Sequence, residues 1–200
     1  MVEASGTSRK RQATRERLLD AACHVVAARG LGRTRIEQIC EAAGYTRGAF
    51  YSNFSDVDEL FFALFEQQVE RTAAQVGRTL AAAGPQRSVK ELVDDVVAAL
   101  TVDRDWLLVR TEFMLHAART PSLQTTLAAH RDTMAAAIVP ALAQVADNPA
   151  LPPELRSPDR LARLVMAVHN GVSLELLLDP DPELFRRNLR DLLVLLLDHH

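Results

Sequence analysis

Apolar residues recur at intervals of three and four positions along most of the chain, with polar residues between them. This spacing places the apolar side chains on one face of an α-helix. Ser, Thr or Asp residues, several of them followed by proline, precede the periodic segments and provide helix starts. No Val/Ile/Thr-rich alternating segment indicates a strand. The sequence therefore predicts an all-α protein of about nine helices, with starts at residues 14, 34, 46, 55, 88, 103, 120, 157 and 181.

Two short helices joined by a tight turn are predicted between Thr34 and Phe54. Thr34 is followed three residues later by Glu37, a spacing typical of a capping box. Gly44 can adopt the left-handed conformation that ends a helix, and Thr46 can cap the next one. The first helix has one apolar face, made by Ile36, Ile39, Cys40 and Ala43. Two helices connected in this way are typical of a helix-turn-helix.

The second of these helices has a polar face that suits nucleic acid. Arg47 matches a guanine edge or a phosphate, and Asn53 matches an adenine edge or a phosphate. Tyr51 can donate its hydroxyl group to a phosphate, and the small Gly48 would let the backbone approach DNA closely. A helical hairpin packed inside a core is the alternative interpretation. The predicted DNA-binding residues are Thr34, Arg35, Thr46, Arg47, Gly48, Ala49, Tyr51 and Asn53.

The segment A-A-G-Y-T-R-G-A-F-Y-S-N-F, followed by S-D-V-D-E-L-F, resembles the recognition-helix region of the TetR family of transcriptional repressors. That family carries A-x-x-A-G-[apolar]-[Ser/Thr]-x-x-x-[aromatic/apolar]-Tyr-x-x-Phe at this place. The matching residues are Ala42, Ala43, Gly44, Thr46, Tyr51 and Phe54. The family usually has a lysine at the position of Val57, where it contacts the DNA backbone, and valine cannot make this contact. The resemblance implies a dimeric repressor with a small-molecule pocket in its helical body.

Charge divides the chain in a way that agrees with DNA binding. Residues 1–54 hold nine Lys/Arg and five Asp/Glu, whereas the remaining residues hold fourteen and twenty-one. A basic head therefore precedes an acidic body, and the head is suited to meet phosphate. The basic run Arg9-Lys10-Arg11 is interpreted as a disordered tail or as an arm that touches phosphate, and the two are compatible.

The helix pattern predicts three parts with different roles. Residues 1–54 form the DNA-binding head, with the helix-turn-helix at residues 34–54. Residues 55–84 form one long connector helix, and residues 85–200 form a ligand-binding and dimerisation domain. Within that domain, Pro140 removes a helical hydrogen bond, so we expect a kink or break in the helix that starts at residue 120.

The last two helices, residues 157–179 and 181–198, are apolar on more than one side. In the second of them, most of the helix circumference is covered by Leu184, Phe185, Leu189 and Leu192–Leu197. A helix that is apolar all round must be buried all round, and a second copy of the chain is the simplest additional partner. We therefore expect a homodimer through these two helices. Two heads would then read a palindrome with half-sites about one helical turn or more apart.

The body also carries residues suited to a pocket for an unidentified small hydrophobic effector. Apolar walls with a few polar groups are typical of ligand sites. The alternative is plain core, because aromatic and methionine residues at helical spacing pack together in most helical proteins. The predicted ligand-binding residues are Trp106, Arg110, Phe113, His116, Met134, Met166, His169 and Asn170.

The sequence favours a regulator over an enzyme and predicts no cofactor. Glu112 and His116 share a helix face and could pair, hold a metal or do neither, but no zinc, P-loop or nucleophile-elbow motif is present. Cys23 and Cys40 lie on apolar faces and are expected to be buried thiols. Two alternatives remain open: a regulator that senses redox through Cys23 or Cys40, and a helical ligand carrier or enzyme with a structural head. The polar N-terminus is unlike a signal peptide, and the longest apolar run, Leu192–Leu197, is too short to span a membrane, so the sequence predicts a cytoplasmic protein.

Overall fold

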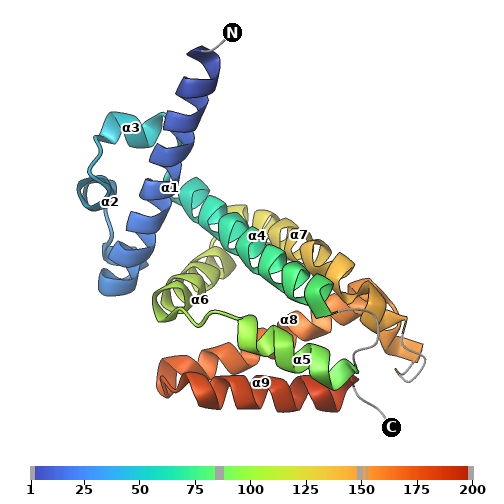
Figure 1. The fold of residues 1–200 in the computed structure, drawn as a ribbon. Coiled ribbons are helices and arrows are strands. Elements are labelled where there is room, and N and C mark those ends of the chain that lie inside the picture. The colour runs from blue at the N-terminus through green and yellow to red at the C-terminus, as the bar shows by residue number, and fades with distance from the viewer. Residues whose placement is uncertain (1–2, 84–87, 148–150, 152, 198–200) are drawn as a thin grey trace. The chain divides into compact units, whose positions relative to one another are not determined.

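The computed structural model describes residues 3–83, 88–147, 151 and 153–197, and this part of the chain forms nine α-helices and two short 3-10 helices without any strand. The predicted all-α class and helix number are confirmed. The elements, drawn in Figure 1, are α1 (Glu3–Arg29), η1 (Leu31–Arg33), α2 (Ile36–Ala43), α3 (Arg47–Tyr51), α4 (Val57–Ala83), α5 (Val89–Ala99), α6 (Arg104–Arg119), α7 (Pro121–Ala146), η2 (Pro153–Leu155), α8 (Pro158–Leu178) and α9 (Pro182–Leu197).

The chain is organised into two compact units. The first contains Met1–Gln67 and Asp105–Gln124, and the second contains Gln68–Arg104 and Thr125–His200. Helix α6 therefore belongs to the same unit as the first three helices, although more than fifty residues separate them in the sequence. The two units are defined by packing, whereas the predicted head, connector and body were defined by function. The predicted boundaries at residues 54 and 84 therefore stay predictions.

The core of the first unit is built from the apolar faces of α1, α2, α3, the start of α4 and α6. Leu18 and Leu19 of α1 and Ile39 of α2 are fully buried in it. Burying each such side chain contributes roughly 1.5–3 kcal/mol. Phe113 of α6 is also fully buried and is surrounded by aromatic rings of α4, which are Phe61, Phe62 and Phe65. This aromatic packing holds α6 against the start of α4.

The second unit is centred on α9, which packs against both α5 and α8 (Figure 1). One face of α9 is buried at every fourth residue, by Phe185, Leu189, Leu193 and Leu197. An ion pair adds to this packing, because Arg190 Nε of α9 lies 2.5 Å from Asp94 Oδ1 of α5. One face of α9 is thus buried within the chain, and its other faces are exposed or half-buried.

Several helix ends match the sequence predictions. Gly44 ends α2 in the left-handed conformation with φ 72°. Ser88 and Glu91 form the predicted capping box of α5, since the Ser88 N–H donates to Glu91 and the Glu91 N–H donates to the Ser88 hydroxyl oxygen. Asp181 caps α9 by accepting from the Glu183 N–H at 2.9 Å. These are contacts within a few residues, which sequence patterns capture well.

Other predicted starts are wrong by a few residues or more. Helix α1 begins at Glu3 instead of residue 14, and the Thr14 hydroxyl donates to the Lys10 carbonyl inside the helix at 2.9 Å. Helix α4 is capped by Asp56 instead of residue 55, because Asp56 Oδ1 accepts from the Glu59 N–H. The residues before Thr14 therefore extend α1 as hydrogen-bonded helix. At the start of α4, the Asp56 carboxylate caps the helix in place of the Ser55 hydroxyl group.

Two further predictions are corrected by the backbone hydrogen bonds. Thr34 does not cap α2: its hydroxyl donates to the Gly30 carbonyl, and the Gln38 side chain accepts from the Arg35 N–H instead. Of the kink or break predicted at Pro140, the break is absent, since α7 is one helix that contains the proline, and the kink stays a prediction. Proline removes a single N–H donor, and the helical bonds on either side maintain the helix.

Candidate nucleic-acid interface

A tight turn sets the geometry between α2 and α3. The Tyr45 N–H donates to the Cys40 carbonyl at 2.9 Å, which closes the left-handed turn at Gly44. Thr46 then begins α3, because its hydroxyl oxygen accepts from the Ala49 N–H at 3.3 Å. The second predicted cap is therefore confirmed. The chain thus passes from α2 to α3 through three residues, Gly44, Tyr45 and Thr46.

Helix α3 is anchored by two aromatic side chains on its inner side. Phe50 is fully buried and Phe54 nearly so, and their ring centroids lie 5.7 Å apart. Because the anchors point inward, the opposite side of this short helix faces solvent. The exposed residues of this side are Thr46, Arg47, Gly48, Tyr51 and Ser52. An exposed polar face on a helix that follows a tight turn is the form in which recognition helices meet the major groove.

Gly48 has room for a larger side chain. A Cβ atom added there would meet only the Thr46 hydroxyl oxygen, at 3.7 Å, which is an ordinary contact. The backbone at Gly48 is also helical and needs no glycine. Glycine in a helix costs about 1 kcal/mol relative to alanine. The described neighbours therefore do not require glycine at this position, and close approach of DNA to the backbone here stays a prediction.

Arg47 is held by two neighbours on the exposed face. Its Nη1 lies 2.9 Å from Glu37 Oε1 of α2, and its guanidinium carbon lies 5.9 Å from the centre of the Tyr51 ring. The Tyr51 hydroxyl group and the Glu37 carboxylate raise the pKa of Arg47 above its usual value. The pair is exposed to solvent, so screening leaves it little effect on stability. Sequence reasoning missed Glu37, because only the angle between α2 and α3 brings it to Arg47.

The remaining predicted DNA-binding residues lie around this face with different environments. Arg35 is exposed, whereas Thr34, Ala49 and Asn53 are half-buried. The Asn53 side-chain amide nitrogen donates to the Ala49 carbonyl at 2.8 Å, and its Oδ1 atom is buried without a hydrogen-bond partner among the described residues. Asn53 is therefore turned toward its own helix, and its contact with DNA stays a prediction.

The first turn of α4 does not favour phosphate. Val57 packs against the core of the first unit. Asp56, Asp58 and Glu59 surround it with negative charge, and Glu59 accepts from the Ser55 N–H at 2.6 Å. The missing lysine at position 57 is thus accompanied by an acidic environment, so a phosphate contact must come from other parts of the head.

Four of the predicted ligand-binding residues lie in the first unit. Phe113 is fully buried, and Trp106 packs against Phe65 with 4.8 Å between ring centres. Arg110 is 7% exposed, and burial lowers its pKa. His116 lies near the surface, where its Nε2 atom is 3.3 Å from Asp58 Oδ1. Phe113 and Trp106 are accordingly part of the aromatic core, and their role toward a ligand stays a prediction.

Three further candidates, Met166, His169 and Asn170, lie on α8 in the second unit and are half-buried. The His169 ring packs edge-on to Phe185, with 6.1 Å between ring centres. The side chain of Met134 lies outside the described residues. A pocket that combines candidates of both units therefore remains an expectation.

Glu112 has a structural role that the sequence left open. Its Oε2 atom accepts a hydrogen bond from the Leu31 N–H at the start of η1, 81 residues away. It thus connects α6 to the turn that leads into α2. His116 pairs with Asp58 instead of Glu112. Among the described residues, no group of three His, Cys, Asp or Glu side chains could hold a metal ion.

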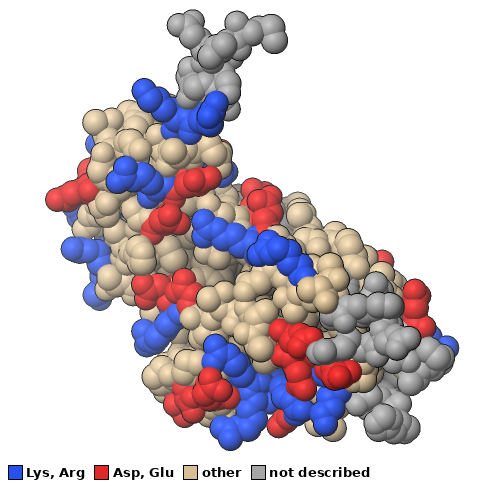
Figure 2. All heavy atoms as spheres, in the orientation of Figure 1, with Lys and Arg blue, Asp and Glu red and all other residues tan. Residues whose placement is uncertain are grey.

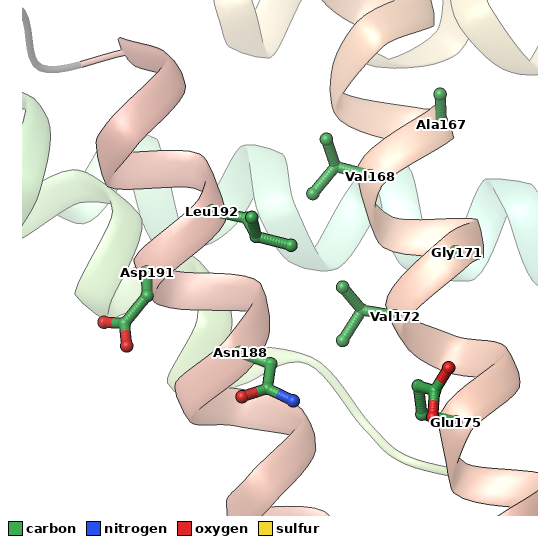
Figure 3. Close-up of a pocket in the computed structure, with 8 residues that line it drawn as sticks. All are labelled: Ala167, Val168, Gly171, Val172, Glu175, Asn188, Asp191 and Leu192. Carbon is green, nitrogen blue, oxygen red and sulfur yellow. The ribbon is translucent and has the colours of Figure 1, made fainter.

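A groove that the sequence did not indicate runs between α8 and α9. Figure 3 shows Leu192 of α9 pointing toward Val168 and Val172 of α8 across this groove. Its complete lining is Ala167, Val168, Gly171, Val172, Glu175, Asn188, Asp191 and Leu192. None of the predicted ligand-binding residues lines it, and it lies on the helices predicted to form the dimer.

Two family models match this chain. The model described as bacterial regulatory proteins, tetR family, matches residues 18–64, and the tetracyclin repressor-like C-terminal domain matches residues 83–199. A curated relative, the HTH-type transcriptional repressor Rv1474c of Mycobacterium tuberculosis, is 33% identical over 100 residues, which are 50% of this chain and 49% of that protein. The match therefore spans about half the length of this relative.

Solved structures share the fold over nearly the whole chain. A putative TetR-family transcriptional regulator from Rhodococcus sp. has a TM-score of 0.76 and 20% identity, and covers 94% of this chain and 100% of its own. The multidrug binding protein EbrR complexed with ethidium has a TM-score of 0.61 and 27% identity, and the match covers 90% of this chain and 97% of EbrR.

Proposed function

The chain belongs to the TetR family of bacterial regulatory proteins, and we propose that it is a dimeric repressor, which a small hydrophobic effector releases from a palindromic operator. As a member of this family it is a DNA-binding transcription regulator and not an enzyme. The repressor direction is supported by the relative Rv1474c, which is described as a repressor. A cytoplasmic location follows from this role, since the operator lies in the cytoplasm.

The observation that carries the proposal is the exposed face of α3. Arg47, Gly48 and Tyr51 point outward above two buried phenylalanines. The exposed side of this five-residue helix thus presents a cation, a phenol and a position without a side chain to solvent. In the major groove these groups would contact base edges and phosphates. We assign DNA binding to the head, residues 1–54, with α4 as the connector and residues 85–200 as the ligand-binding and dimerisation domain.

The dimer is supported by apolar surface that one chain leaves uncovered on α8 and α9. Large side chains that would be buried in a partner are exposed here: Leu174 by 46%, Leu178 by 84%, Leu192 by 46% and Leu195 by 71%. Helix α8 has a mean hydropathy of 1.4 over its most apolar window, only 28% of which is buried, and by length and composition alone it could cross a membrane. Contact with a second copy would cover this surface, as expected for a two-fold helical interface.

The effector is proposed to bind the helical body. EbrR, which shares the fold, is described as a multidrug binding protein and was solved with ethidium, a flat aromatic cation. The residues that we assign to the effector in this chain are the eight candidates on α6, α7 and α8, Trp106, Arg110, Phe113, His116, Met134, Met166, His169 and Asn170. The effector would stabilise a body conformation that holds the two heads at the wrong spacing for the operator. The coupling between effector and operator is typically 1–3 kcal/mol, or about 5–150-fold in affinity.

A redox-sensing regulator is not favoured by the thiols. Neither Cys23 nor Cys40 forms a disulfide, and both are buried, with 8% and 3% of their surface exposed. Burial, together with the nearby Glu37 carboxylate, raises the pKa of Cys40. Reactive thiols require the opposite environment, in which the thiolate is stabilised and accessible.

The first experiment is a titration of the purified protein against the DNA upstream of its own gene, with a scrambled duplex of the same length as control. Tight, sequence-specific binding of two protomers per site would support the proposal. Equal affinity for both duplexes, at a protein concentration where the dimer is intact, would contradict an operator at this position. The effector arm uses ethidium: at saturation it should lower operator affinity, and unchanged affinity would exclude this class of aromatic cation as inducer.

A further inference from the structure

The end of α1 that precedes the matched family segment carries most of the positive charge of the head. Residues 1–17 hold five Lys/Arg and two Asp/Glu, whereas residues 18–54 hold four and three. Within the described side chains of this end, the cations are Arg9, Lys10, Arg11, Arg15 and Arg17. The acid among them, Glu16, accepts a hydrogen bond from Gln12 at 2.9 Å. Figure 2 shows Lys and Arg side chains gathered beside the grey N-terminal residues.

These cations lie on a continuous helix, so their direction is fixed by the core. Arg11 and Arg15 precede the buried Leu18 by seven and three residues, which places them on the same helix face. The face of α1 that packs against α2 and α3 therefore continues past the core as a basic stripe. In Figure 1 the short α3 lies beside the N-terminal half of α1, and α2 lies beside its other half.

Three contacts place cations of α1 at both ends of α3, two of them from the stripe and one from Arg17. The Arg17 guanidinium lies over the Tyr45 ring, just before α3, with 5.6 Å to the ring centre. Arg11 Nη2 donates to the Ser52 carbonyl at 2.9 Å, just after α3. Arg15 lies over the Phe54 ring at 5.2 Å. The cations of α1 are thus at the two ends of the helix that carries the exposed polar face.

The dimensions of DNA indicate what these cations meet. Helix α3 has five residues and rises about 7.5 Å, which is less than the roughly 12 Å width of the major groove. Phosphates that border the groove therefore lie just beyond the helix ends. Arg11 uses one N–H group for Ser52, and a guanidinium has about five donors, so it can bind a phosphate at the same time. Arg9 and Lys10 directly precede Arg11 in the same turn of α1, and both are exposed.

We propose that Arg9, Lys10 and Arg11 form a second phosphate-binding site, which contacts the DNA backbone next to the base pairs under α3. The site rests on the proposed DNA-binding function and extends it beyond the residues matched to the family's DNA-binding segment. Its contacts are to the backbone, so they strengthen binding to every sequence equally and carry no base preference. Arg11 also positions α3, because it holds the carbonyl at the helix end.

The test is the double variant Arg9→Gln with Lys10→Gln, which leaves Arg11 and its contact with α3 unchanged. Glutamine favours helices about as well as lysine and arginine, so α1 should persist, and circular dichroism checks this. The control is Lys90→Gln with Arg104→Gln, which removes the same charge from exposed positions of the second unit. Affinity is measured at several salt concentrations on a duplex selected from a random library by the unaltered protein, and on a scrambled duplex.

Each phosphate contact contributes about 0.9 to the slope of log affinity against log salt. For a dimer, the Arg9/Lys10 variant should therefore reduce the size of this slope by about 2–4 on both duplexes. The ratio of its affinity for the selected duplex to its affinity for the scrambled duplex should not change. The control variant should have the same slope as the unaltered protein. A slope equal to that of the control would overturn the second site while the proposed function stands. Failure of the unaltered protein to select or bind any duplex would overturn both.

Discussion

Glu112→Ala removes the hydrogen bond by which α6 holds the turn before the helix-turn-helix. The Glu112 carboxylate accepts from the Leu31 N–H and lies close to Gly30, where an added Cβ would come within 3.4 Å of its Oε2 atom. The N–H group is at the start of η1, where no helical carbonyl is available to it. Without the carboxylate this half-buried donor has no replacement in the chain.

The expected loss follows from the chemistry of the bond. Hydrogen bonds to charged groups contribute about 1.5–3 kcal/mol, and the contact is only half-buried, so we expect about 2 kcal/mol for Glu112→Ala. Glu112→Gln keeps an acceptor but loses the charge, and charge-assisted bonds are roughly twice as strong as neutral ones. We therefore expect about 1 kcal/mol for this variant. For a chain of this size, 1 kcal/mol corresponds to a Tm shift of about 2–4 °C.

The assay is thermal unfolding followed by circular dichroism at one fixed protein concentration, because dimerisation makes Tm concentration-dependent. Glu154→Gln, at an exposed position on η2, removes the same charge elsewhere and serves as control. The order of Tm should be unaltered protein and control, then Glu112→Gln, then Glu112→Ala. A Tm for Glu112→Ala within 1 °C of the control, or above that of Glu112→Gln, would refute the role assigned to this carboxylate.

Four further predictions concern single residues. Gly48→Ala should raise stability by about 0.5–1 kcal/mol and weaken operator binding in a gel-shift titration; stronger binding would contradict close approach at this position. Phe113→Ala should lower the free energy of unfolding in urea by about 3–5 kcal/mol, since the ring is fully buried; a loss below 1 kcal/mol would mean that this core is loosely packed. Cys40 should react with a thiol reagent at pH 7 only after unfolding, because its raised pKa disfavours the thiolate; rapid reaction of the folded protein would revive redox sensing. Leu195→Glu should shift the dimer to monomer in sedimentation, whereas Leu115→Glu, on the 51% exposed leucine of α6, should not; an intact Leu195→Glu dimer would place the interface elsewhere.

Helix class, helix number and several helix ends were determined by the sequence alone. The turn at Gly44, the cap at Thr46 and the capping box at Ser88 depend on atoms within about four residues. Such interactions are decided by local chemistry, so the same residues specify them in any protein. The exposed polar face of α3 followed from the same reasoning, once Phe50 was placed inside.

The tertiary structure decided which distant side chains meet. Glu37 reaches Arg47 only because of the angle between two helices, and Glu112 reaches the Leu31 N–H across 81 residues. Phe113, a predicted ligand contact, lies in an aromatic core because α6 packs on α4. Hydrophobic periodicity indicates which face of a helix is buried, but it does not indicate which other helix covers that face, because the hydrophobic effect is non-directional. Contacts between helices are therefore fixed by the packing of the whole chain, which no local pattern records.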